Sequence, residues 1–245
     1  MAKVLIRNRL MTRQQKYYEF QEPGYAGRYD GYVSSGHPAE INDVAAAKFG
    51  VVGMVRTAEL AGFPRVIGFD DAPFAKKVGS PVNVSGIVCA GTRMEGMLWG
   101  QATRDGDDAT DTLLTMLKGS KFHHQVHLAL IDGLTIGGFN VIDLPTLAAE
   151  IDRPCIAVMR KMPDRPAIER ALRRFDDYER RWGLILKAGD IHQHGAFVYQ
   201  VAGASPETVA LALQRLTDTG HVPECLRLAH LIGSAIKTGS SSRRA

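Results

Sequence analysis

This 245-residue sequence has few cysteines, no long apolar run and no dominant sign of charge. Its three cysteines, at positions 89, 155 and 225, are too few and too scattered for a disulfide framework or a four-cysteine zinc site. No apolar run approaches the roughly 18 residues that suggest a membrane span, and no secretory signal is visible at the start. We therefore expect a soluble cytoplasmic protein with no membrane partner.

The charge balance is only mildly basic. Thirty Lys and Arg residues against 26 Asp and Glu residues give a net charge of +4 and an isoelectric point near 9.0. This excess permits a polyanionic partner such as nucleic acid, but binding depends more on how positive charge is clustered than on the total. The length and an apolar content of 45% predict one large domain, or a domain with an appendage, around a substantial core.

Regular periodicity is missing from residues 1–62. The first 16 residues carry five basic side chains and no acid, and the stretch QEPGYAGRYDGYVSSGHPAE is rich in glycine and tyrosine. A basic arm on nucleic acid and a transit peptide are two interpretations. We favour a poorly ordered extension that follows from a misplaced start codon, with Met54 as the candidate start, and we place the folded domain at residues 63–245.

Regular elements begin at Arg65. Strands are expected over 65–70, 82–90 and 94–103, followed by a helix over 108–117, a strand over 127–132, a helix within 139–151 and a strand over 154–159. A helix over 166–181, short strands at 184–186 and 196–201, and helices over 205–216 and 223–237 complete the chain. Three antiparallel strands followed by alternating helices and parallel strands are the order of the ribonuclease H-like fold. The sequence therefore predicts an α/β protein with a mixed sheet and helices on both faces.

Two of the predicted strands end on acidic residues. VIGFDDAPF places Asp70 and Asp71 after an apolar run, and HLALIDG places Asp132 before Gly133. The first pair is also typical of a solvated turn, since Pro73 follows it. Because ligands of open α/β sheets bind outside the carboxyl ends of the strands, we favour a metal or proton-transfer site that includes Asp70 and Asp132.

A third group of acids lies between these two strands, in TRDGDDATD. It contains Asp105, Asp107, Asp108 and Asp111. One of them can cap the helix that follows, but four suggest a site shared with the two strand ends. Repulsion among carboxylates is relieved by a divalent cation, and Mg²⁺ prefers oxygen ligands. We expect Mg²⁺, with Mn²⁺ as its substitute.

The histidines offer one further candidate. In PECLRLAH, Arg227 and His230 are three residues apart and neighbour each other on one helical face, although His230 also fits a hydrogen-bonded core position. His192 and His194 have a spacing that suits metal ligands on a strand, but their glycine-flanked setting is more typical of an exposed loop. The charged run ERALRRFDDYERR indicates a salt-bridged, solvated helix face.

Four motifs together resemble one family. RVIGFDDAPF, DGDDAT, ALIDGLTIGGFNVIDL and PECLRLAHLIGSAI are similar to domain-of-unknown-function family 99, the endonuclease dU family, which is related to endonuclease V. The resemblance extends from Arg65 to about Arg244. It implies a ribonuclease H-like fold and Mg²⁺-dependent cleavage of a phosphodiester near a deaminated base.

The resemblance also implies roles for individual residues. The first-strand aspartate of the endonuclease V group falls on Asp70, and its Asp-Gly pair falls on Asp132 and Gly133. Its PE-x-x-R-x-AH segment places the metal-site histidine at His230.

Two arginines and one acid complete this implied site. Arg227 lies in the same PE-x-x-R-x-AH segment. In PCIAVMR, Arg160 stands where the group has an active-site lysine, and arginine keeps the charge and can grip a phosphate through two hydrogen bonds. The remaining acid of endonuclease V lies in a Phe-Arg-Glu motif that is missing here. Position along the chain points to the DGDDATD cluster, with Asp108 as first choice and Asp107 or Asp111 next.

The leading interpretation is a metal-dependent endonuclease of nucleic-acid repair that acts on DNA in preference to RNA. We expect four residues to bind Mg²⁺ and take part in catalysis: Asp70, Asp132, Asp108 and His230. We expect three residues to contact substrate: Arg160, Arg227 and Gly133. Two alternatives stay open, a Mg²⁺-dependent hydrolase of a small phosphorylated metabolite and a nucleic-acid-binding module that does not cleave.

Overall fold

The computed structural model of the protein describes residues 64–241. The basic arm, the transit peptide and the irregular extension considered for residues 1–62 lie outside the described residues. Within the described part of the chain, no helix is long and apolar enough to cross a membrane.

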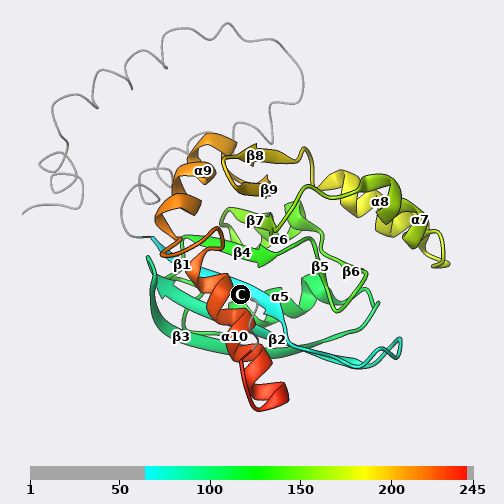
Figure 1. Ribbon diagram of the computed structural model, residues 1–245, viewed down its shortest axis with the longest axis horizontal. Helices are drawn as coiled ribbons and strands as arrows, with labels where there is room; N and C mark the ends of the chain where they lie inside the picture. The colour runs from blue at the N-terminus through cyan, green and yellow to red at the C-terminus, as the bar shows by residue number, and fades with distance from the viewer. Residues whose placement is uncertain (1–63, 242–245) are drawn as a thin grey trace, which may run out of the picture. The chain divides into compact units, whose positions relative to one another are not determined.

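A seven-stranded mixed sheet forms the centre of the described domain (Figure 1), in the order β3-β2-β1-β4-β7-β9-β8. Its first three strands are antiparallel: β1 (Arg65–Asp71), β2 (Pro81–Ala90) and β3 (Arg93–Thr103). Strands β4 (Leu128–Asp132) and β7 (Cys155–Met159) run parallel to β1, and the antiparallel strands β9 (Phe197–Ala202) and β8 (His192–His194) follow. A separate hairpin of β5 (Thr135–Ile136) and β6 (Asn140–Val141) comes directly after β4. The predicted ribonuclease H-like fold is confirmed.

Helices cover both faces of this sheet. One face carries α5 (Ala109–Lys118), α6 (Leu144–Ile151), α7 (Arg165–Leu172) and α8 (Tyr178–Lys187), and the other carries α9 (Pro206–Arg215) and α10 (Glu224–Thr238). The buried apolar residues accordingly form two clusters, one on each face. Because both faces are covered, a central strand such as β4 is apolar up to its final residue and does not alternate with polar residues.

Alternation along β1 assigns its side chains to the two faces. Val66 belongs to the core cluster with α9 and α10, whereas Phe69 belongs to the other cluster. Gly68 shares the face of Val66, and a Cβ atom at this position would lie 2.7 Å from the Cys225 carbonyl carbon. Glycine is needed here because α10 approaches the strand so closely. Asp70, two residues further on, also lies on the α10 face.

A buried serine fixes α10 over the end of β1. Ser85 of β2 is opposite Asp70 in the β1–β2 register, and its hydroxyl donates a hydrogen bond to the Ala229 carbonyl oxygen at 2.8 Å. Since Ala229 precedes His230, this contact holds the histidine close to the carboxyl end of β1.

The region between β7 and β9 differs from the prediction. The strand predicted at 184–186 is wrong, because these residues lie inside α8, where Arg181 and Ile185 are buried one helical turn apart. The helix predicted over 166–181 is two helices, α7 and α8, and between them Phe175 packs edge-on against Phe139 at a ring distance of 5.6 Å. His192–His194 form the edge strand β8 instead of the expected loop.

Candidate metal centre

Register places the two strand-end aspartates side by side. β1 and β4 pair in parallel through Phe69 and Ile131, and the next residues along these strands are Asp70 and Asp132. Leu130 belongs to the core cluster of the α9 and α10 face, so alternation puts Asp132 on that face together with Asp70. Both carboxyls therefore lie on one side of the sheet at its carboxyl edge, where open α/β sheets bind ligands.

Helix α10 adds a histidine to this pair. His230 Nδ1 lies 2.9 Å from Asp70 Oδ2, and ligand atoms of Asp70, Asp132 and His230 all lie within 4.8 Å of one another. Their side chains are 8%, 17% and 23% exposed, respectively, so the group is largely buried and can still be reached from solvent. Among residues 64–241 this is the one group of three acidic, thiol or imidazole side chains that could share a metal ion. We call it the Asp-Asp-His cluster.

Like charges crowd the Asp-Asp-His cluster. Burial, followed by the neighbouring charges of Asp132 and Asp71, raises the pKa of Asp70 to about 8. A divalent cation between the carboxylates would turn their repulsion into attraction and allow Asp70 to ionise. The donor chemistry and the crowding of these acids therefore both fit a metal ion.

Arg160 extends the same face beyond the end of β7. Val158 is opposite Asp132 in the β4–β7 register, and Arg160, two residues on, donates a hydrogen bond from Nη2 to Asp132 Oδ2 at 2.9 Å. Its side chain is 47% exposed. The guanidinium is therefore attached to the cluster and accessible to an anion.

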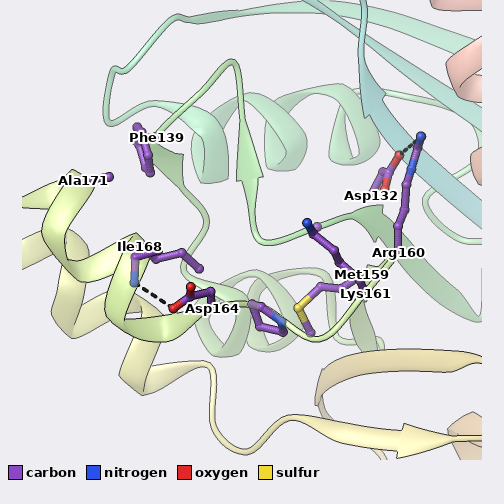
Figure 2. A pocket seen from close by; sticks show the side chains of 11 residues that line it. Asp132, Phe139, Met159, Arg160, Lys161, Asp164, Ile168 and Ala171 are labelled. Atoms are coloured by element: carbon purple, nitrogen blue, oxygen red, sulfur yellow. Dashed lines mark hydrogen bonds and ion pairs between the residues drawn. The ribbon is translucent and has the colours of Figure 1, made fainter.

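A pocket of about 430 Å³ lies beside Asp132 (Figure 2). Its lining comes from the ends of β4 and β7, from Phe139 of the β5–β6 hairpin and from Ile168 of α7. Gly133 marks the turn from β4 into the hairpin, with φ of +85° and an amide that donates to the Val158 carbonyl oxygen at 2.7 Å. The volume falls within the range of small-molecule pockets, about 300–1,000 Å³.

Asp71, next to Asp70, faces the opposite side of the sheet. Its Oδ2 atom accepts a hydrogen bond at 2.6 Å from the amide of Gly137 in the β5–β6 hairpin. Burial raises the pKa of Asp71, and the hydrogen bond from Gly137 opposes this rise. No role was predicted for Asp71, although the two-residue period of a strand indicates that adjacent side chains point to opposite faces.

Asp108, predicted as a metal ligand, does not lie in the Asp-Asp-His cluster. Its carboxylate accepts hydrogen bonds from the Thr103 amide at 3.0 Å, the Thr103 hydroxyl at 2.8 Å and the Asn140 side-chain amide at 2.6 Å. Burial alone would raise the pKa of Asp108, but these hydrogen bonds lower it overall. The structure places this acid where it closes the turn between β3 and α5. Asp107 and Asp111 are exposed and also outside the cluster.

Asp105 and Arg181 connect the turn after β3, the β5–β6 hairpin and α8. Asp105 is buried, has φ of +54°, and accepts a hydrogen bond from the Phe139 amide at 2.9 Å. Arg181 of α8 has a side chain only 6% exposed and donates to three carbonyl oxygens, those of Asp105, Gly106 and Phe139. Sequence reasoning missed this residue because its run of alternating charges is typical of a solvated helix face.

The other predicted residues lie outside the cluster. Arg227 pairs with Glu224 on the first turn of α10 through hydrogen bonds of 2.6 and 2.7 Å. Its contact with substrate stays a prediction, as does that of Gly133, which lines the pocket. His192 and His194 belong to no group of three potential metal ligands within residues 64–241.

Comparison with known proteins identifies one family. The family described as endonuclease dU matches residues 63–237. A relative from Methanothermobacter thermautotrophicus, named UPF0215 protein, is 39% identical over 182 residues, which cover 72% of this chain and 89% of the relative. The crystal structure of a protein of unknown function from Archaeoglobus fulgidus is 35% identical and covers 70% of this chain and 97% of its own, with a TM-score of 0.67. Endonuclease V from Bacillus subtilis is more distant, 11% identical over 83% of this chain and 95% of its own, with a TM-score of 0.49.

Proposed function

We propose that this chain, which belongs to the endonuclease dU family, is a metal-dependent nuclease that hydrolyses a phosphodiester in nucleic acid near a deaminated or otherwise altered base. The observation that carries the proposal is the convergence of Asp70, Asp132 and His230, whose ligand atoms lie within 4.8 Å of one another. The family description and the accessible Arg160 beside the cluster support the same function.

The donor set of the cluster suits a divalent cation. Two carboxylates and an imidazole offer oxygen and nitrogen ligands, and a set of three protein ligands leaves room for water and a substrate phosphate. Such an ion would stabilise charge on the phosphate and acidify a bound water. We propose Mg²⁺ as this ion, with Mn²⁺ as a substitute.

Each residue of the site would have its own part in the reaction. Asp70 and Asp132 would hold the ion from adjacent strands, so the β1–β4 register sets their separation. His230, 2.9 Å from Asp70, would complete the ligand set or orient the attacking water, since imidazole can exchange a proton near neutral pH. Arg160 would bind a phosphate oxygen, because its forked donors can contact Asp132 and an anion together.

The distribution of charge favours nucleic acid as the partner. Residues 160–187, from the end of β7 through α8, contain nine basic and five acidic side chains, and eight basic ones remain when the buried Arg181 is left aside. Helix α7 of this segment also lines the pocket beside Asp132. A phosphodiester backbone that passes the cluster would therefore meet positive charge. We propose DNA as the substrate, and RNA is the comparison that tests this choice.

The pocket supports a role for an altered base. Phe139 offers an aromatic side chain against which a base could stack, and Met159 and Ile168 add apolar lining to the same pocket. An altered base leaves a duplex at lower energetic cost than a well-paired one, which would favour its capture beside the cluster.

The same pocket supports a second candidate, the hydrolysis of a small phosphorylated metabolite. Its volume suits a small molecule, and a fold does not determine which substrate a site accepts. The two candidates share the cluster and differ only in what occupies the pocket.

Cleavage of labelled oligonucleotides tests the proposal. The panel contains single- and double-stranded DNA and RNA, each with one inosine or one uracil, assayed with Mg²⁺, Mn²⁺ or EDTA. We expect a cut near the altered base that requires the metal and is lost in Asp70→Asn. Phosphate release from nucleotides without any oligonucleotide cleavage would favour the second candidate, and salt-sensitive binding without cleavage would identify a binding module.

A further inference from the structure

The β5–β6 hairpin connects directly to the Asp-Asp-His cluster. It begins just after Asp132 and Gly133, and its Phe139 lines the pocket beside them (Figure 2). The position of this hairpin therefore sets one part of the pocket wall. What holds the hairpin in place decides the shape of the space next to the cluster.

Two aspartates hold the tip of this hairpin. The Gly137 amide donates to Asp71 Oδ2 at 2.6 Å, and the Gly137 carbonyl oxygen accepts from the Asp105 amide at 2.9 Å. Asp105 also accepts the Phe139 amide at 2.9 Å. The backbone on both sides of residue 138 is thus bonded to groups outside the hairpin.

The sequence of the tip is adapted to this close contact. Gly137 has φ of +59°, and a Cβ atom on it would lie 2.8 Å from a Val82 methyl carbon. Gly138 has φ of +96°, and a Cβ atom on it would lie 2.4 Å from Asp105 Oδ1. Both positions require glycine for their backbone angles and for the approach to their neighbours.

Asp71 differs from Asp105, the other anchor of the hairpin, in its position in the fold. It follows Asp70 directly on β1, so one strand presents a cluster carboxylate on one face and the hairpin anchor on the other. Any shift of the end of β1 therefore moves both together.

We propose that Asp71 is a positioning residue: through its hydrogen bond to Gly137 it fixes the β5–β6 hairpin and hence the Phe139 part of the substrate pocket, without itself binding the metal. The effect on substrate rests on the proposed nuclease function. The effect on the hairpin does not, and the two are measured separately.

Three variants and one control test this inference. Asp71→Ala removes the acceptor and leaves the Gly137 amide without its partner. Asp71→Asn keeps an oxygen that can accept the same hydrogen bond, and Asp71→Ser is a milder replacement should the alanine variant fold poorly. Ser205→Ala is the matched control, because it removes a hydrogen-bond acceptor from the Thr208 amide at the start of α9, on the other face of the sheet.

Hydrogen exchange followed by mass spectrometry measures how firmly the hairpin is held, and Mn²⁺ titration measures the affinity of the cluster for metal. In Asp71→Ala we expect exchange over residues 134–141 to become roughly 10-fold to 100-fold faster, the factor that a lost hydrogen bond to a charged acceptor implies. Exchange over β1 and α10 and the affinity for Mn²⁺ should stay within about threefold, since no metal ligand changes. With an oligonucleotide that the wild type cleaves, KM should rise about 10-fold while kcat changes little, and Asp71→Asn should restore most of both effects.

Several outcomes would overturn the inference. One is hairpin exchange in Asp71→Ala and Asp71→Ser at the wild-type rate. A second is faster exchange with no change in KM, because the anchor would then have no part in substrate binding. A third is a loss of Mn²⁺ affinity as large as in Asp70→Asn, which would make Asp71 a ligand. If the wild type cleaves nothing, the proposed function fails, while the exchange measurement still decides whether Asp71 anchors the hairpin.

Discussion

Two groups of aspartates in this protein contain the same residue type and differ in what surrounds their oxygens. In the Asp-Asp-His cluster, Asp70 and Asp132 come from adjacent strands, and burial and like charges raise the pKa of Asp70 to about 8. In the 105–111 segment, Asp108 accepts three hydrogen bonds from Thr103 and Asn140, which hold its pKa below its usual value.

The surroundings of the carboxylates distinguish a metal site from a structural turn more clearly than the number of acids does. The 105–111 segment has four aspartates, more than the cluster, but Asp108 is bonded within the fold and Asp105 bonds the hairpin. The cluster has two aspartates that face each other and an imidazole. An acid that the fold supplies with donors has little left to offer a ligand, whereas crowded acids are stabilised by a cation.

The strongest test of the comparison is to neutralise one acid in each group. Asp70→Asn should lower metal-dependent cleavage by about 1,000-fold or more, because it removes a ligand that positions the ion. Asp108→Asn should leave the rate per folded molecule within about fivefold. The measurement is kcat on the best oligonucleotide of the panel, with circular dichroism to confirm folding. Equal losses of kcat in the two variants would show that the two groups of aspartates do not differ in function.

A smaller effect is expected at the imidazole. His230→Ala should weaken Mn²⁺ binding by about 10-fold to 100-fold, since two carboxylates would remain to hold the ion. Isothermal titration calorimetry measures this change. His192→Ala serves as the control, and similar losses in both variants would show that His230 has no special place in the cluster.

Asp108 should matter for stability and not for metal binding. Asp108→Asn should lower the free energy of unfolding by about 1–3 kcal/mol, because an amide group cannot accept all of the hydrogen bonds from Thr103 and Asn140. Urea denaturation measures this loss, and the Mn²⁺ affinity of the same variant should stay within about twofold. If the variant is as stable as the wild type but binds Mn²⁺ poorly, Asp108 is a metal ligand after all.

The last expected effect is a dependence of stability on pH in EDTA. The pKa of Asp70 is about 8 in the folded protein, above the ordinary 3.8. The folded state therefore keeps a proton that the unfolded state releases, and stability falls as pH rises from about 4 to about 8.

In Asp70→Asn, residue 70 carries no charge at any pH in this range. The part of the fall in stability that comes from Asp70 should therefore disappear. At pH 8 the variant should be more stable than the wild type, because the wild type has by then lost the stability that protonated Asp70 supplied. Urea denaturation at several pH values with EDTA measures both slopes. Parallel curves for the two proteins would contradict the raised pKa.

Much of the fold was predictable because its signals are local. Apolar runs, helix caps such as Ser205 and the order of elements predicted the sheet and most of the helices. Asp70 and Asp132 were predicted to lie together because each ends an apolar strand. The strand predicted at 184–186 was wrong because three residues of a buried helix face resemble a short strand.

The remaining features depend on contacts between distant segments. Asp108 is bonded to Asn140 across 32 positions, and Arg181 reaches carbonyl oxygens 42 to 76 positions away. No local pattern reveals which acid will find such donors. The acidic segment therefore resembled a site until its hydrogen-bond partners were known.

Mn²⁺ titration of three proteins, followed by electron paramagnetic resonance, tests the central claim most directly. The claim is that Asp70, Asp132 and His230 together hold a divalent cation. We predict that the wild type and Asp108→Asn bind Mn²⁺ with affinities within about twofold of each other, and that the double variant Asp70→Asn with Asp132→Asn loses at least about 100-fold. Full Mn²⁺ binding by the double variant would contradict the account.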